Sequence, residues 1–582
     1  MVRALRFGTE YRLDRLQAIR ETRAMTDKPE GRPHEAPRAA ALGGVARAWR
    51  FVRASFAQGR SPALWAAALV VGLVAGYAAL GLRLGIEMVQ FAAFADRTER
   101  LASAARDLSP LHVIAAPLIG GAVVSGLLWF GMARGWIEET RAGGVADVME
   151  ARAIKAGRMS MTRGLWSGLI ASVSLGSGAS AGREGPAVHL GATLASAVTR
   201  PLGLPARAAR IILACGAASA VSASFNAPVA GALFAFEVIL GHYALRSIAP
   251  VAVSSVIGAL VARIHYGAQP AFAMPAIEPA GVIDFIAVIP LGAAAAGLAI
   301  AFILAATAAP RLAAERARAL NWPLWALPPF GGLAVGLIAV AAPEVLGVGY
   351  EATSTALGGG YAMATLAGLI ALKLLATVIT LAARFGGGVF SPSLYLGAML
   401  GALFGAVATQ LFGEATAGAA FFAVVGMGAV SGAVLGAPLS TTLIVFELTA
   451  SYEASIALLV AVSLATVITQ SVTKGSYFHK QVERHGYDLT QGDARVILQT
   501  IRAREIMSPV DSEEAPVKPD GPFVYEDDYL GRVIGYFSAE SIDGAPVRAR
   551  SGDQPVIGYL SKSEAHAAYA RALQARSEEE HR

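Results

Sequence analysis

The residues best able to do chemistry in this chain are an arginine and a glutamate enclosed by glycines and a proline, Gly182-Arg183-Glu184-Gly185-Pro186. They stand inside a long apolar stretch. Charge buried in a membrane is costly, so it is generally there for a function. The alternative is a surface ion pair in a soluble loop, and the composition of the chain distinguishes the two.

The composition predicts an all-α polytopic membrane protein. The 582 residues are 55% hydrophobic and only 15% charged, against roughly 25% charged in soluble domains. Mean hydropathy is +0.53. Apolar runs near the ~20 residues that a bilayer core requires recur at residues 62–90, 110–131, 247–262, 283–309, 323–342, 361–383 and 454–472.

Shorter apolar pieces, broken by glycine and proline, lie between these runs. In hydrocarbon, interrupted backbone is tolerated only where it is buried in protein or lines a wet cavity. The pieces therefore predict half-helices that meet at a site. They cover residues 164–200, 207–241, 387–412 and 418–450.

Two pairs of segments indicate an internal duplication. Residues 182–192 align without a gap on residues 388–398, with matching proline, Leu-Gly and alanine. Residues 216–237 align on 426–447, so that Glu237 falls on Glu447. We therefore expect two repeats, about 62–264 and about 282–472, within a transmembrane domain of residues 62–480.

The charges of the loops predict that the two repeats have opposite orientations. Residues 264–284 contain no lysine or arginine, whereas Arg311, Arg316 and Arg318 crowd the following loop. Basic loops stay on the cytoplasmic side, so the first loop is expected outside and the second inside. Inverted repeats with broken helices form substrate sites near the midplane.

The glycine-rich starts of two helices, after Gly182 and after Gly386, predict an anion site. A helix N-terminus presents unpaired N–H groups and a partial positive charge of about half a unit. Two such ends would bind an anion without trapping it, as conduction requires. Glu184 could occupy the place of the anion, and its protonation would release it.

These motifs resemble those of the CLC family of chloride channels and chloride/proton antiporters. The resemblance covers about residues 62–480. It rests on GREGP at 182–186, GGVFSP at 387–392, FNAPVAGALFAFE at 225–237, GAPLSTTLIVFE at 436–447 and the tyrosine of KGSYF, Tyr477.

The resemblance implies roles for individual residues. Glu184 would be the gating glutamate. The backbone amides of Val389 and Phe390 would line the anion sites, together with Gly182, Arg183, Gly185 and Pro186 of the first motif. The hydroxyl of Tyr477 would donate to the central anion, because a phenol donates a hydrogen bond yet stays neutral near pH 7.

Two positions depart from the family pattern. Gly143 stands where the family has a hydroxyl donor, so a backbone N–H or water must compensate at the central site. Val238 stands where antiporters of the family carry a second glutamate on the proton route, and valine cannot carry a proton. We therefore favour passive, gated anion conduction. The alternative is a chloride/proton antiporter with a non-standard proton route. Glu237 and Glu447 are read as structural acids at helix ends.

Both ends of the chain are predicted to be cytoplasmic, on a bacterial-type inner membrane. Residues 1–61 form a basic tail without the apolar segment of a signal peptide, and Met25 is an alternative start. Residues 481–582 are polar and include fragments that resemble a CBS module. The span is short for a pair of such modules, so we expect a small α/β region, with nucleotide binding as the weaker alternative.

The remaining expectations concern rivals and partners. Gly178 to Gly182 matches the G-x-S-x-G pattern of hydrolases, but the context lacks a strand and a positioned histidine, so no enzyme is predicted. A secondary transporter of another anion is the stronger rival. We expect a homodimer in the lipid bilayer that binds no cofactor, metal or nucleic acid. Cys215 is read as a core residue. The sequence does not choose among chloride, nitrate and fluoride.

Overall fold

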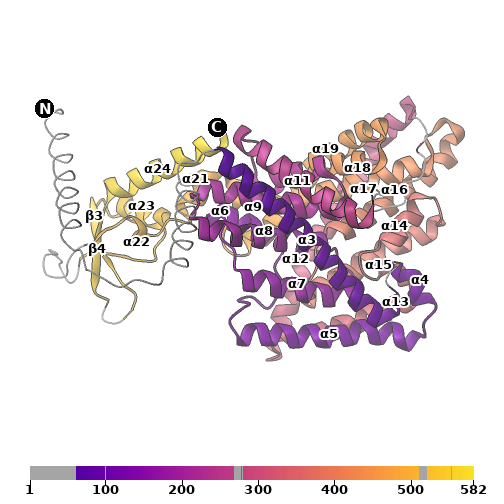
Figure 1. Cartoon of the computed structure of the whole chain (residues 1–582), viewed down its shortest axis with the longest axis horizontal. Coiled ribbons are helices and arrows are strands. Elements are labelled where there is room, and N and C mark those ends of the chain that lie inside the picture. Colours follow the sequence, from indigo (N-terminus) through magenta and orange to yellow (C-terminus); the bar gives the residue numbers. More distant parts are fainter. Residues whose placement is uncertain are drawn as a thin grey trace, which may run out of the picture. The chain divides into compact units, whose positions relative to one another are not determined.

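The computed structural model describes residues 61–581, apart from positions 97, 99, 268–276, 278–279, 510–520 and 552–553. The basic tail expected before residue 61 lies outside them. In the described part, ten helical segments are long and apolar enough to cross a membrane (Figure 1). The predicted all-α polytopic fold is confirmed. The helices of the ten segments are α3 (Ser61–Phe94), α5 (Pro110–Ala133), α9 (Ala206–Phe225), α11 (Leu245–Tyr266), α12 (Val282–Ala319), α13 (Pro328–Ala341), α15 (Met363–Ala382), α16 (Phe390–Phe412), α17 (Gly418–Leu435) and α19 (Tyr452–Thr473).

The apolar pieces that are rich in glycine and proline are broken helices. In the first half, α7 (Met161–Gly176) ends before α8 (Glu184–Leu202), and α9 ends before α10 (Pro228–Phe234). The second half repeats the pattern, with a break between α15 and α16 and another between α17 and α18 (Pro438–Thr449). Proline at the first helical position starts both α10 and α18, where its missing N–H costs nothing.

Equivalent glycines make equivalent contacts in the two halves. A Cβ on Gly191 of α8 would lie 2.5 Å from the carbonyl oxygen of Gly216 on α9. Gly397 and Gly426, their partners in the repeat alignment, stand in the same relation on α16 and α17, at 2.3 Å. Only glycine allows the backbones of membrane helices to approach so closely. The contacts therefore follow the duplication read from the sequence.

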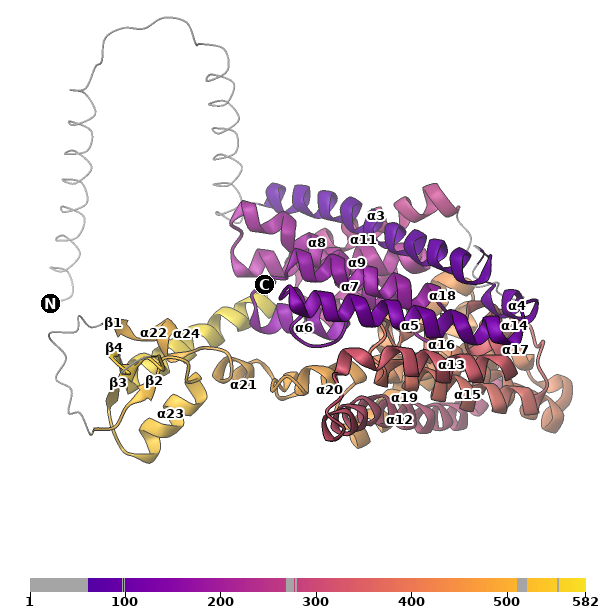
Figure 2. The ribbon, with the colours of Figure 1, turned by 90° about the horizontal axis from the view of Figure 1, so that it is seen from below.

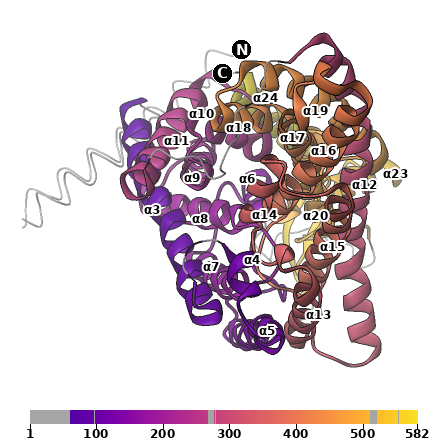
Figure 3. The same cartoon turned by 90° about the vertical axis from the view of Figure 1, so that its right-hand side faces the viewer.

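Each half also caps a short helix of the other. The carboxylate of Glu237 accepts hydrogen bonds from the N–H groups of Leu439 and Ser440, 3.0 and 2.8 Å away, at the start of α18. The carboxylate of Glu447 accepts from Val229 and Ala230, at 3.0 and 2.8 Å, at the start of α10. α10 and α18 lie side by side (Figure 3). These carboxylates satisfy donors that a helix N-terminus leaves unpaired.

The polar C-terminal region is a small α/β unit, as predicted. Its four-stranded sheet has the order β1-β4-β3-β2, in which only β2 and β3 are parallel (Figure 2). Leu530, Phe537, Val547 and Leu560 are fully buried in its core. Its elements are α21 (Asp493–Leu498), α22 (Ala503–Ile506), β1 (Ser508–Pro509), β2 (Val524–Tyr525), α23 (Leu530–Ala539), β3 (Gly544–Arg548), β4 (Val556–Ser561) and α24 (Lys562–His581).

Short elements complete the membrane domain and reach the site. Two of them, α6 and α20, approach from sequence positions more than 300 residues apart and contact each other. The short elements are α4 (Leu101–Arg106), α6 (Val145–Ile154), the π-helical turn η1 (Ala235–Leu240), η2 (Leu324–Ala326), η3 (Pro343–Val345), α14 (Tyr350–Leu357), η4 (Gly413–Ala415), α20 (Tyr477–Glu483) and η5 (Leu489–Gln491).

Candidate anion site

Two helix N-termini from opposite halves meet at one point. Gly182 and Gly388, which are equivalent in the repeat alignment, form an isolated antiparallel bridge with two hydrogen bonds of 2.7 Å. Helix α8 begins two residues after the first glycine, and α16 begins two residues after the second. A Cβ on Gly185 would lie 3.2 Å from the Cα of Gly388, so the approach is tight. The bridge thus fixes both helix starts against each other.

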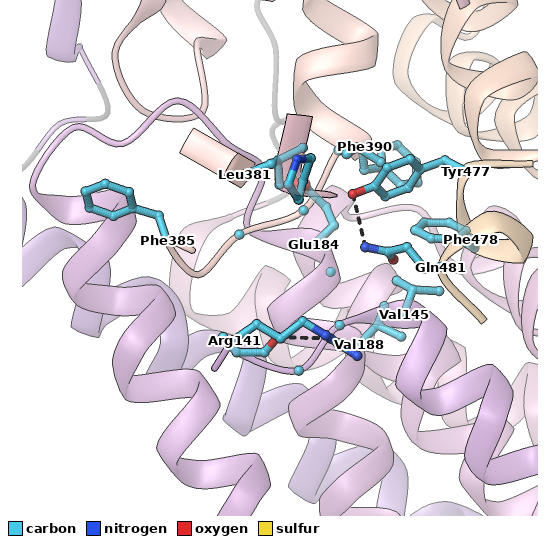
Figure 4. A pocket seen from close by; sticks show the side chains of 18 of the residues that line it. Arg141, Val145, Glu184, Val188, Leu381, Phe385, Phe390, Tyr477, Phe478 and Gln481 are labelled. Atoms are coloured by element: carbon cyan, nitrogen blue, oxygen red, sulfur yellow. Dashed lines mark hydrogen bonds between the residues drawn. The ribbon is translucent and has the colours of Figure 1, made fainter. Parts of the chain in front are cut away.

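A cavity of about 80 Å³ lies at this meeting point. That is room for several water molecules, since each needs about 10–15 Å³. Glu184 and Gly185 at the start of α8 line it, together with Val389 and Phe390 at the start of α16 (Figure 4). Tyr477, the first residue of α20, lines it as well. Backbone donors and partial positive charge from two helices therefore surround one cavity.

The phenol of Tyr477 is oriented by its neighbour one helical turn later. Its oxygen accepts a hydrogen bond of 3.0 Å from Nε2 of Gln481, drawn as a dashed line in Figure 4. Because that bond occupies the oxygen as an acceptor, the phenolic proton remains available to an acceptor in the cavity. The Tyr477 hydroxyl is therefore a neutral donor at the wall of the cavity.

Glu184 is held by two hydroxyl groups. Its side chain is 1% exposed. The Tyr350 hydroxyl donates to Oε1 at 2.7 Å, and the Ser391 hydroxyl donates to Oε2 at 2.6 Å. A buried carboxylate requires such donors. The carboxylate thus sits between α14 and the start of α16, with a partner on each oxygen.

A buried lysine holds the segment that precedes Tyr350. Lys373 on α15 is inaccessible to solvent and donates to the carbonyl oxygens of Val345 and Gly347, at 3.0 and 2.9 Å. Gly349, the residue before α14, has φ +87°, which favours glycine. The guanidinium of Arg183 lies 5.0 Å from the centre of the Tyr350 ring. Tyr350 is thus fixed from its backbone and from its ring face.

Gly143 leaves space that His189 fills. A Cβ on Gly143 would lie 2.2 Å from Nε2 of His189, whose side chain is 2% exposed. The N–H of Gly143 donates to Ser167 Oγ at 3.0 Å, and the N–H of Gly144 donates to Asp147 Oδ2 at 2.7 Å. Neither group can therefore replace the missing hydroxyl donor. Val145, at the first position of α6, lines the cavity, and its N–H is one of those that a helix start leaves without a partner inside the helix.

An ionic cluster joins α6 to the segment after α20. His485 lies 2.5 Å from Glu150 and 3.2 Å from Glu139. These hydrogen bonds, that to Glu139 first, raise the pKa of His485 to about 9. The bond from His485 lowers the pKa of Glu139 to about 2. Arg141, which lines the cavity, forms a bidentate pair with Asp147 at 2.9 and 3.0 Å. This network fixes the loop that carries Gly143.

The structure separates the predicted site residues into two groups. Glu184, Gly185, Val389, Phe390, Tyr477 and Gly143 line the cavity. Gly182, Arg183, Pro186 and Val238 do not line it. Gly182 forms the bridge described above, Arg183 packs on Tyr350, and Pro186 is buried within the first turn of α8. Val238 lies buried on η1.

Several residues of the site were not predicted from the sequence. Tyr350, Ser391, Gln481, Arg384 and Arg484 contact Glu184 or Tyr477, or line the cavity. Ser391 lies inside the GGVFSP motif, so the motif marks its position in the sequence. Tyr350 follows a glycine-rich turn, which marks a bend in the chain but no chemistry.

The fold and the site define a class of membrane protein, a two-repeat helical bundle with broken helices around an anion-sized cavity. The family model described as voltage gated chloride channel matches residues 120–470. A ClcB-like chloride channel protein of Ralstonia nicotianae is 32% identical over 423 residues, which cover 72% of this chain and 96% of the relative. The chain belongs to the CLC family.

Other comparisons agree on this family. The voltage-gated ClC-type chloride channel ClcB of Escherichia coli is 28% identical over 419 residues, covering 72% of this chain and 98% of that protein. A slow cyanobacterial Cl⁻/H⁺ antiporter has the same fold, with a TM-score of 0.63, 21% identity and coverage of 72% and 97%. A CLC-type fluoride/proton antiporter has a TM-score of 0.60 at 20% identity, covering 72% and 98%.

Proposed function

We propose that this protein carries chloride or a similar inorganic anion across the membrane, through the cavity at the starts of α8 and α16, with Glu184 as its gate. The observation that carries the proposal is the position of the Glu184 carboxylate, which lies at the cavity between two converging helix N-termini. An anion entering the cavity would compete with this carboxylate for the same positive ends of the helices. Protonation of Glu184 would remove the competitor.

We favour passive, channel-like conduction over obligate exchange with protons. Val238 is a buried apolar residue at the position of the second family glutamate. The adjacent acid, Glu237, is engaged by two N–H groups and the hydroxyl of Ser440. A carboxylate fixed in this way is a poor proton carrier because each transfer would leave the start of α18 uncapped. The two solved structures named above are antiporters by title, so proton exchange is the competing function.

The distribution of charge supports one orientation of the protein in the membrane. Pro310 of α12 lines the cavity, and Arg311 and Arg316 follow it along the same helix. Basic termini of membrane helices favour the cytoplasmic side. The end of the cavity near Pro310 therefore opens to the cytoplasm in this proposal, and the C-terminal α/β unit lies on the same side.

We further propose a homodimer, with one pathway in each subunit. Large apolar side chains are exposed on four neighbouring helices, α10, α11, α18 and α19. Examples are Val229 at 54%, Leu439 at 45% and Val460 at 44% exposure. Lipid or a second copy can cover such a surface. A single cysteine placed at Val229 would separate the two, because a cross-link at that position in native membranes must join two copies of the chain.

The test is a flux assay in proteoliposomes that records chloride and pH together. The wild-type protein is expected to move chloride without stoichiometric proton movement. Glu184→Gln, which mimics the protonated acid, is expected to conduct at every pH between 4 and 8. Chloride uptake that drives protons in a fixed ratio would establish exchange instead. A variant that keeps the full pH dependence would remove Glu184 from the gate.

A further inference from the structure

A cavity separate from the candidate anion site lies where the end of α8 meets the start of α9. Its volume is about 310 Å³, within the range of about 300–1,000 Å³ that small-molecule sites occupy. The described residues that line it are Ala156, Arg158, Thr199, Arg200, Gly203, Leu204, Ala206 and Ala209. This lining offers a ligand two guanidinium groups and no carboxylate.

The cavity lies at one surface of the membrane. Helix α9 is a membrane-spanning segment that begins at Ala206, a lining residue. Pro205 before it provides no side-chain cap. The first N–H groups of α9 therefore have no partner inside the helix and add partial positive charge. A ligand in this cavity would lie at the level of the lipid headgroups, where a hydrocarbon-spanning helix starts.

The linker between α6 and α7 holds Arg158 at this cavity. Gly157 has φ +75°, and a Cβ there would lie 3.0 Å from the carbonyl carbon of Ala209 on α9. On the other side of Arg158, the N–H of Met159 donates to Oγ of Ser196 on α8 at 2.8 Å. The linker is therefore fixed between α8 and α9, and the Arg158 side chain extends from a fixed backbone.

Arg158 and Arg200 are cations without a countercharge. Both residues are exposed, and within the described part of the chain neither forms an ion pair with a carboxylate. Lys155 nearby is, by contrast, paired with Glu150 at 2.7 Å. Two like charges at one cavity repel each other, so an anion bound between them would stabilise both.

An exposed apolar stripe begins three residues after Arg158. Met161, Leu165 and Leu169 recur every four residues on α7 and are 36, 52 and 44% exposed. Residues four apart lie on one face of a helix. At 1.5 Å per residue the stripe is about 12 Å long, which fits within one leaflet of a hydrocarbon core about 30 Å thick. The cavity and the stripe together match a molecule with an anionic head and an apolar tail.

We propose that this cavity binds the headgroup of an anionic phospholipid, one acyl chain of which lies along the apolar stripe of α7. Guanidinium groups bind phosphate oxygens through two parallel hydrogen bonds. Basic pockets between membrane helices at the bilayer surface bind anionic headgroups. The ammonium of a zwitterionic headgroup would meet the same two arginines and be repelled. The site is separate from the anion pathway and does not depend on its function.

Three variants test the charge at the cavity. Arg158→Gln and Arg200→Gln each remove one guanidinium, and the double variant removes both. Arg246→Gln is the matched control, because Arg246 is an exposed arginine near the start of α11 that does not line the cavity. All these positions are exposed, so the fold should be retained, and equal melting temperatures without added lipid would confirm this.

The experiment is titration of phosphatidylglycerol into the detergent-solubilised full-length protein, with bound lipid counted by native mass spectrometry. Each single variant at the cavity should weaken the tightest binding about fivefold, as expected for one arginine near a membrane surface. The Arg246→Gln control should bind as the wild type does. Phosphatidylethanolamine, inorganic phosphate and glycerophosphoglycerol, which is the same headgroup without acyl chains, should each bind at least tenfold more weakly than phosphatidylglycerol.

Two kinds of result would overturn the site. Phosphatidylglycerol binding by the double variant equal to that of the Arg246→Gln control would show that the arginines hold no headgroup. Equal binding of phosphatidylethanolamine would show that charge does not select the lipid. Binding of inorganic phosphate or glycerophosphoglycerol as tight as that of phosphatidylglycerol would assign the cavity to a soluble phosphate compound and exclude the acyl chain from α7.

Discussion

The hydroxyl of Tyr350 lies 2.7 Å from Oε1 of Glu184 and donates a hydrogen bond to it. Tyr350 begins α14 in the second repeat, whereas Glu184 begins α8 in the first. The Glu184 carboxylate is therefore held across the boundary between the repeats. A neutral donor stabilises its charged form without a countercharge that would bind it permanently.

Removing the Tyr350 hydroxyl should allow the Glu184 carboxylate to leave its position more often. Tyr350→Phe keeps the ring against Arg183 but deletes the hydroxyl, so the carboxylate loses one of its two hydroxyl partners. We expect anion flux at pH 7 to rise roughly tenfold, as the loss of a hydrogen bond to a charged group predicts. Proteoliposome flux measures it. Tyr452→Phe, at a tyrosine 71% exposed on α19, is the matched control. Flux equal to that of the control would show that the bond does not hold the gate.

The hydroxyl of Tyr477 should contribute to anion selectivity. Tyr477→Phe removes the donor and also leaves Gln481 without its acceptor. We expect the relative rates for chloride, bromide and iodide to change, by about fivefold for the most strongly hydrated ion, because that ion depends most on replacement donors. The measurement is flux with each halide. Identical ratios in variant and wild type would place the phenol outside the pathway.

Restoring a serine at position 143 should fail unless His189 is also changed. A Cβ there would overlap the imidazole at 2.2 Å, and overpacking of a tight interior costs about 1–3 kcal/mol. Gly143→Ser alone should lower the melting temperature of the purified protein. The double variant Gly143→Ser, His189→Ala should regain part of the loss and bind chloride more tightly. Equal melting temperatures for the wild type and the single variant would contradict this account.

His485 should make the stability of the protein depend on alkaline pH. Its folded pKa of about 9 lies above the ordinary value of 6.5, owing to Glu139 and Glu150. The stabilisation is therefore complete below about pH 6.5 and is lost as pH rises through about 9. Arg141 nearby acts against it by charge repulsion.

The comparison is between the wild type and His485→Gln, by thermal melting from pH 6 to pH 10. The variant should melt lower than the wild type at pH 6, and the difference should shrink toward pH 10. A constant difference across this range would show that the charge of His485 contributes nothing to the cluster.

Much of the fold could be predicted because apolar length and glycine spacing are local properties. The alignment of Gly182 with Gly388, and of Glu237 with Glu447, identified equivalent positions in the two repeats. The contacts that each pair makes were less predictable from the sequence. Glu237 and Glu447 were expected at helix ends, but their exchange between the two halves depends on three-dimensional packing of α10 against α18.

The donors around Glu184 could not be read from the sequence for a physical reason. Tyr350 is 166 positions from Glu184, and an isolated tyrosine after a glycine-rich turn has no characteristic spacing. Arg384 resembles an ordinary cation at the end of a helix. It is distinguished by its left-handed backbone and by a buried Nε that has no acceptor among the described residues, and both are properties of coordinates. The resemblance to a CBS module in residues 481–582 stays a prediction.

The crossed caps of α10 and α18 bear on how the molecule is made. Glu237 completes a helix that the ribosome synthesises about two hundred residues later, and Glu447 completes one that has long been inserted. Neither half can finish its own short helix. In a half synthesised alone, the short helix should thus stay uncapped until the other half is present. Two halves expressed as separate chains should assemble into the complete domain. The ancestor of the duplicated gene would have assembled as a pair of identical chains, each supplying the glutamate that its neighbour lacked.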